Sequence, residues 1–191
     1  DVYKRQSLAY PMLGGALIEA GIEVKVFDAC VGSEKDDLKE VFYKSSPLPS
    51  GMLRTGVSNE RILEEVSDYD IIGMTSIFSH QETMVLETAK LIKKHYPEKL
   101  LISGGVNARH RTDKFFNAGF DVICLSESEK TIVHICQLFE KGIREFSSVP
   151  KVIFRHKEKF VFSKAQGDII WNLDELPLPC LLYTSDAADD L

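Results

Sequence analysis

Three pairs of residues in the middle of the chain are suited to holding a cofactor. Each pair stands where a short apolar run ends, and the pairs are Thr75-Ser76, Gly104-Gly105 and Ser126-Glu127. A hydroxyl group at such a position can bond to a ring nitrogen or a phosphate. Paired glycines let the backbone approach a flat ligand closely, because they carry no side chain. The residue types and their spacing therefore predict a ligand-binding edge.

Two further side chains fall at the same predicted edge. His80 is the one histidine well placed there, and Asp28 ends a predicted strand. His80 could contact a ligand or be a solvated loop residue, and Asp28 could contact the ligand or only turn the chain. The sequence alone leaves both alternatives open.

Catalytic and metal-binding patterns are missing from the sequence. The cysteines have neither C-x-x-C nor C-x-x-x-C-x-x-C spacing, so they predict no iron–sulfur or zinc site; they are Cys30, Cys124, Cys136 and Cys180. Neither a G-x-G-x-x-G fingerprint nor a phosphate-binding P-loop is present, and no Ser–His–Asp or paired-carboxylate arrangement can be proposed from spacing. We expect no catalytic residue and no metal ligand within the chain.

Composition narrows the class of protein. The 191 residues suffice for one domain, and 44% hydrophobic content is ordinary for a globular protein. A net charge of −6 argues against a general nucleic-acid surface, and no apolar run approaches the roughly 18 residues of a membrane span. Cys124 and Cys136 fit core positions in a reducing cytosol, so we expect a cytoplasmic protein without nucleic-acid or membrane partners.

The elements that position the candidate residues alternate between strand and helix. Short apolar strands end at Thr75, Gly104 and Ser126, and a further strand is predicted over 23–28. Amphipathic helices are predicted over 11–20, 59–66, 81–95, 112–118 and 129–141. This alternation predicts a doubly wound parallel α/β sheet covered on both faces, with ligands at the carboxyl ends of its strands. A hairpin over 152–162 and a proline-spaced connector over 171–179 follow.

The two ends of the chain differ from the rest in character. We expect residues 1–6 to be a non-native leader and residues 180–191 a non-native tail, because both resemble translated adapter sequence. Residues 7–148 then form the α/β domain, and residues 149–179 form the hairpin and linker. The first strand of the sheet is expected to be truncated, because only the leader stands before the first helix.

The order of these pieces resembles the cobalamin-binding domain of radical S-adenosylmethionine enzymes. Individual motifs are short, but together they span about Pro11 to Pro179. They are Pro11–Gly14, Ala20-Gly21, Glu23–Asp28, Asp70–Gly73 with Thr75-Ser76, Ser103–Gly105, Ser126–Glu129 and Leu173–Pro179. The resemblance implies a flavodoxin-like fold that binds cobalamin, in which the paired glycines lie against the nucleotide tail.

The same resemblance implies more of the parent protein than of this chain. A [4Fe–4S] cluster and S-adenosylmethionine would be bound by a covalently linked radical barrel, which this chain lacks, commonly for methyl transfer to unreactive carbon. One motif departs from the pattern: the family's Gly-Glu-Gly-Glu turn is Ser126-Glu127-Ser128-Glu129 here. Serine disfavours positive φ, and either Ser126 or Ser128 would serve as a helix N-cap.

Two other classes of function remain open at this point. The domain could be a degenerate structural module that keeps the fold without the ligand, which the serines at 126 and 128 favour. It could also be a receiver-like or nucleotide-binding domain, because fold alone does not separate these functions. A C-x-x-x-C-x-x-C motif shortly after Pro179 in the parent sequence would decide for the radical enzyme.

Overall fold

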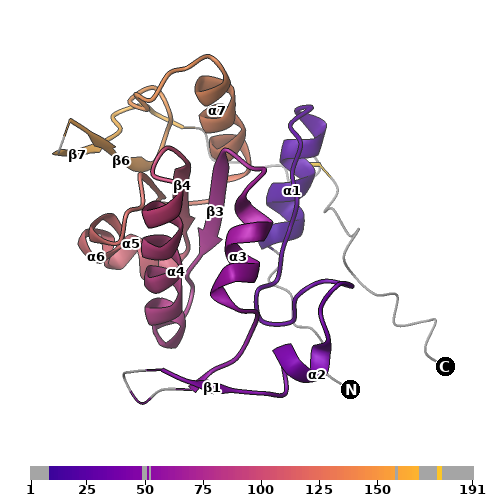
Figure 1. The fold of residues 1–191 in the computed structure, drawn as a ribbon. Coiled ribbons are helices and arrows are strands. Elements are labelled where there is room, and N and C mark those ends of the chain that lie inside the picture. The colour runs from indigo at the N-terminus through magenta and orange to yellow at the C-terminus, as the bar shows by residue number, and fades with distance from the viewer. Residues whose placement is uncertain (1–8, 49–50, 52, 158, 168–175, 178–191) are drawn as a thin grey trace.

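The computed structural model describes residues 9–48, 51, 53–157, 159–167 and 176–177, and Figure 1 shows the arrangement of its elements. The predicted leader, the tail and most of the connector lie outside these residues. The helices are α1 (Ala9–Glu19), α2 (Leu38–Val41), α3 (Asn59–Val66), η1 (Ser79–Gln81), α4 (Glu82–His95), α5 (Val106–His110), α6 (Thr112–Asn117) and α7 (Glu129–Glu140).

One five-stranded mixed sheet forms the centre of the described residues. Its strands, in spatial as well as chain order, are β3 (Ile71–Thr75), β4 (Leu100–Gly104), β5 (Val122–Cys124), β6 (Val152–His156) and β7 (Lys159–Phe162). The first three are parallel, whereas β6 and β7 join in antiparallel pairs. The predicted α/β class is confirmed, and the predicted hairpin continues the same sheet.

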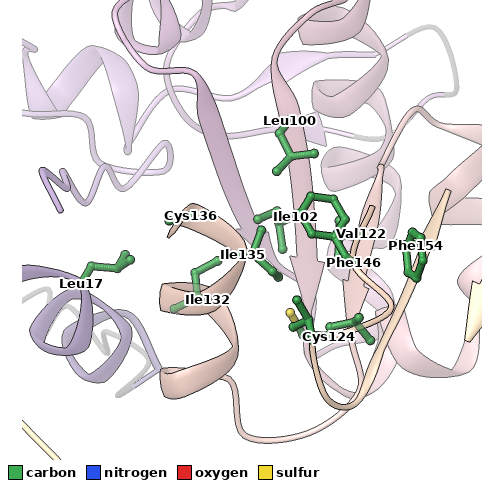
Figure 2. Packing of buried hydrophobic residues seen from close by; sticks show 12 residues of the cluster. Leu17, Leu100, Ile102, Val122, Cys124, Ile132, Ile135, Cys136, Phe146 and Phe154 are labelled. Atoms are coloured by element: carbon green, nitrogen blue, oxygen red, sulfur yellow. The ribbon is translucent and has the colours of Figure 1, made fainter. Parts of the chain in front are cut away.

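Both faces of the central strands are buried, and alternate residues serve alternate faces. Leu100, Ile102 and Val122 lie in one core beneath α1 and α7, whereas Leu101 and Ile123 lie in the other core with α3 to α6. Figure 2 shows the first core, where side chains of α7 point toward the sheet and α1 approaches α7 from its other side. The period of two along each strand therefore explains why these runs are continuously apolar.

The strand predicted over Glu23–Asp28 is wrong. The structure assigns no strand to this stretch and has only an isolated bridge between Asp28 and Gly32. A strand needs a hydrogen-bonded neighbour, and within the described residues β3 is the edge of the sheet, with β4 as its one strand partner. The apolar alternation that predicted the strand reflects burial instead, since Val24 packs against one core and Phe27 against the other.

Smaller differences concern loops. A separate two-stranded sheet stands in the stretch before α3, where β1 (Ser46–Pro47) pairs antiparallel with β2 (Leu53–Arg54). Helix α5 follows Gly105 directly and was not predicted, because five residues are too few to show a helical apolar period. Ser58 caps α3, and its side chain accepts a hydrogen bond from the Arg61 backbone N–H.

A cluster of charged side chains fastens the long loop after Asp28 to α3. Arg61 Nε lies 3.2 Å from Asp36 Oδ1, and Arg61 Nη1 lies 2.8 Å from Glu65 Oε2. Lys25 makes a second ion pair with Glu65. The backbone N–H of Ser33 donates to Asp36, and together with the Ser33 hydroxyl and Arg61 it holds the pKa of that carboxyl below its ordinary value.

Replacing Asp36 with Asn should therefore make stability less dependent on pH. A carboxyl with a depressed folded pKa contributes stability above its unfolded pKa of about 4, and this contribution is lost as pH falls through the folded pKa. The difference in unfolding free energy between wild type and Asp36→Asn should become smaller as the pH is lowered from neutral to about pH 2. Urea denaturation across this range measures it. Asp68→Asn, at an exposed position without an ion pair among the described residues, is the control. A constant difference for Asp36→Asn would contradict the assignment.

The hairpin strand β6 should behave as part of the core. Phe154 is fully buried and packs edge-on against Phe146, whereas Phe162 on β7 is 65% exposed. Phe154→Ala should cost about 3–5 kcal/mol of unfolding free energy, and Phe162→Ala well under 1 kcal/mol. Equal losses in chemical denaturation would show that β6 does not belong to the folded unit.

Candidate functional site

The predicted strand ends lie along one edge of the sheet. Thr75 is the register partner of Gly104 in the parallel pair β3–β4, and β5 runs in the same direction beside β4. Ser126 follows two residues after the end of β5. The structure therefore brings these three positions to a shared carboxyl edge, as predicted, because parallel strands end on the same side of a sheet.

A buried polar contact locks β3 to α5 at this edge. Ser76 is fully buried, its backbone N–H donates to the Gly104 carbonyl, and its own carbonyl accepts from the Asn107 backbone. The Asn107 amide also donates to the Ser76 hydroxyl over 2.9 Å. The hydroxyl of Ser76 thus has a protein partner, and Thr75 is the more exposed of the two hydroxyl residues.

The two adjacent glycines have different surroundings. Gly105 has φ +97°, and a Cβ there would lie 2.5 Å from the Ser76 carbonyl oxygen. A Cβ on Gly104 would meet only the Cβ of Cys124, at an ordinary 3.8 Å. Gly105 is therefore required by the turn itself. Gly104 leaves open space at the edge, where a ligand can approach the backbone.

An apolar surface borders the glycines. Phe78 is 56% exposed and stacks on His80, with ring centroids 5.5 Å apart and planes 15° from parallel. Val106, directly after Gly105, is 53% exposed. His80 is thus an exposed ring held against Phe78 in the loop that leads to α4. An exposed stacked pair and an exposed aliphatic group, each close in sequence to the end of a strand, offer apolar contact to a ring-shaped ligand.

The loop after β5 carries the remaining predicted residues. Ser126 is partly buried and its hydroxyl bonds to the carboxylate of exposed Glu127, which is the main reason that the pKa of Glu127 is lowered. Ser128 takes the N-cap position of α7 but donates its hydroxyl to the Ser126 carbonyl. Ser128 therefore occupies the predicted N-cap position, but its side chain makes no capping hydrogen bond and bonds within the loop instead.

Tyr10 lies beside Thr75, at the end of β3. Tyr10 interacts with the backbone of Thr75 and lies within electrostatic range of Asp28 and Cys30. Burial, with a smaller contribution from the Asp28 carboxylate, raises the pKa of the Tyr10 phenol. Asp28 therefore lies within electrostatic range of a phenol at the end of β3, although its strand does not form.

Four residues of this edge escaped the sequence reasoning: Tyr10, Phe78, Val106 and Asn107. Phe78 carried a usable signal, since a large aromatic residue three positions after a strand end is unusual in a segment that should be solvated. Asn107 and Tyr10 carried no such signal, because their roles depend on contacts with Ser76 and Thr75, two residues that are distant from them in the sequence.

The described residues hold no group of three or more His, Cys, Asp or Glu side chains that could bind a metal ion. Among the same residues, no helix is both long and apolar enough to cross a bilayer. The chemistry available at the carboxyl edge is therefore that of hydroxyl groups, backbone amides, carboxylates and exposed rings. Such an edge can hold and orient a ligand.

Comparison with solved structures finds the same fold in two enzymes. The chain matches the cobalamin-dependent S-adenosylmethionine radical enzyme OxsB, with aqua-cobalamin and S-adenosylmethionine bound, at a TM-score of 0.67, with 18% identity over 93% of the chain. It matches the radical S-adenosylmethionine methyltransferase TsrM from Kitasatospora setae, with cobalamin and a [4Fe–4S] cluster bound, at 0.58, with 16% identity over 82% of the chain. The predicted resemblance is confirmed in the fold.

One curated protein is similar in sequence as well. Cytidylyl-2-hydroxyethylphosphonate methyltransferase from Streptomyces wedmorensis is 28% identical over 133 residues, which is 65% of this chain. No protein-family profile matches. The chain spans 23% of the methyltransferase, 22% of OxsB and 26% of TsrM, so it corresponds to a minor part of each.

Substitution by alanine should destabilise the protein at Gly105 and have little effect at Gly104. Gly105→Ala places a methyl group against the Ser76 carbonyl at a positive φ, and it should cost about 1–3 kcal/mol of unfolding free energy. Gly104→Ala should change that free energy by less than about 0.5 kcal/mol. Thermal or chemical denaturation of the matched pair measures both. A neutral Gly105→Ala would mean that the Ser76–Gly105 contact is looser than the structure has it.

Proposed function

We propose that this chain binds cobalamin at the carboxyl edge of its sheet. The single observation that carries the proposal is the environment of Gly104, where the strand ends in open space between Thr75 and the loop after β5. Cobalamin combines a broad flat ring with a long nucleotide tail, and a tail needs a path that side chains do not fill. The fold shared with OxsB and TsrM supports the same ligand.

The proposed arrangement uses each candidate residue in a distinct way. The tail passes Gly104 and Gly105 and meets the hydroxyl of Thr75, while Ser76 supports the turn from inside. The ring lies over the strand ends against Phe78, His80 and Val106. Ser126 and Glu127 border it on the β5 side, where the carboxylate of Glu127 can accept hydrogen bonds from the amide groups of the ring. Bound cobalamin would supply cobalt-centred group transfer, and the chain would hold and orient it.

We further propose that the chain belongs to a longer radical S-adenosylmethionine enzyme, possessing a [4Fe–4S] cluster and a covalently linked barrel outside these 191 residues. The similarity to a curated methyltransferase favours methyl transfer as the reaction of that enzyme. In this proposal residues 7–148 form the cofactor-holding domain, and residues 149–179 lead toward the barrel.

A second candidate function is a structural module that keeps the fold without cobalamin. Two observations favour it. Serines stand where the related pattern has glycines, and the Ser128 hydroxyl is engaged by the Ser126 carbonyl, so that the loop after β5 is stabilised without a ligand. The Ser76 hydroxyl is likewise satisfied by Asn107.

Titration with hydroxocobalamin, followed by its visible spectrum and by calorimetry, separates the two functions. The wild-type chain should bind at accessible concentrations. Gly104→Val should weaken binding by about tenfold or more, since it fills the open space at the strand end, and this equals about 1.4 kcal/mol. Gly73→Val is the matched control: it adds the same side chain in the middle of β3, where a Cβ meets nothing within 4 Å.

The outcomes are distinct. Absence of binding by the folded wild-type chain would favour the structural module. Equal binding by wild type and Gly104→Val would leave cobalamin as the ligand and place its tail elsewhere. Phe78→Ala should weaken binding as well, because it removes the apolar surface and the support of His80.

A further inference from the structure

A second candidate site lies at the opposite, amino edge of the sheet. A cleft of about 280 Å³ opens there between the end of α4, the starts of β4 and β5, and the segment after α7. Its charged lining residues are Lys93, Lys99, Arg144 and Arg155 together with Glu98 and Asp121. Four cations face two carboxylates, although the whole chain carries a net charge of −6. The lining of the cleft therefore carries a net positive charge, whereas the whole chain carries a net negative one.

The two lysines of the cleft are occupied by the fold. Lys93 Nζ pairs with Asp121 Oδ2 at 2.7 Å and donates to the Lys99 carbonyl at 2.6 Å. Lys99 is 6% exposed, and its Nζ donates to the carbonyls of Ser67 and Tyr69 beyond the end of α3. Both ammonium groups thus neutralise carbonyl oxygens near helix ends, where partial negative charge collects. Asp121 is likewise engaged, since it also accepts from the Leu101 backbone.

The two arginines have no carboxylate partner among the described residues, and they differ from the lysines in that their N–H groups are largely unused by the fold. The Arg144 guanidinium lies over the Phe139 ring, 3.5 Å from its centre, and makes no hydrogen bond within the same residues. Arg155 lies over the Phe160 ring and donates one N–H to the Phe116 carbonyl. A contact with a ring uses the face of a guanidinium, so the N–H groups at its edge remain able to donate.

We propose that this cleft binds a phosphate group between Arg144 and Arg155. Guanidinium groups held in place are the side chains best matched to phosphate oxygens, because their N–H groups form paired, charge-assisted hydrogen bonds. The excess positive charge of the lining has no protein anion to balance it, and an oxyanion supplies that balance. The site does not depend on the carboxyl edge, so its success or failure is independent of cobalamin binding.

Calorimetric titration of the full chain with inorganic phosphate tests the proposal, at an ionic strength held constant with sodium chloride. Wild type should bind phosphate, and Arg144→Gln should lower the affinity by about tenfold. Lys94→Gln, which removes the same charge from an exposed position of α4 outside the cleft, should leave the affinity within about twofold. A parallel titration with glycerol 3-phosphate distinguishes a free phosphate site from one for a phosphorylated small molecule.

Arg155→Lys provides a second variant, because it keeps the positive charge and loses the planar fork. It should weaken phosphate binding while leaving the response to salt unchanged, and circular dichroism checks that it folds. Absence of phosphate binding by wild type would overturn the proposal. So would equal losses in Arg144→Gln and Lys94→Gln, since these would show that only net charge matters.

Discussion

Burial of both faces of β4, β5 and β6 is the constraint on which the rest of the structure depends. Ile123 and Ile153 face one core, and Val122, Val152 and Phe154 face the other, with every one of these side chains 3% exposed or less. Full burial of such a side chain contributes roughly 1.5–3 kcal/mol, so no helix can leave its face without a large loss. Helices on both sides of the sheet follow from this requirement.

That arrangement divides the molecule into two chemically different edges. At the carboxyl edge, loops between strand and helix place glycines, hydroxyl groups and exposed rings around the end of β4. At the amino edge, helices end, and cations such as Lys99 bond to the carbonyls that a helix leaves unpaired. The same topology therefore explains why a ligand with apolar surface suits one edge and an anion suits the other.

Neighbouring residues of one type can have opposite roles, as Gly104 and Gly105 show. A side chain on Gly105 would clash with the carbonyl of Ser76, and the positive φ of Gly105 belongs to the fold. A Cβ on Gly104 would meet only the Cβ of Cys124, at 3.8 Å, so the side-chain position of Gly104 is available to a ligand. Ser76 and Thr75 differ in the same way, since Ser76 supports the turn from within and Thr75 remains within reach of the edge.

The amino-acid sequence by itself determined the α/β class, the positions of the main helices, and the meeting of Thr75, Gly104 and Ser126 at one edge. These features follow from local periodicity and from the rule that parallel strands end together, and both are legible in a single chain. The strand predicted over 23–28 failed because a strand depends on a hydrogen-bonded neighbour. Only the tertiary structure decided that Ser76 is bonded to Asn107, that Phe78 stacks on His80, and that Arg144 and Arg155 line one cleft. Each of these contacts depends on which surfaces the packed helices cover and which they leave open, and this packing cannot be deduced from residue type alone.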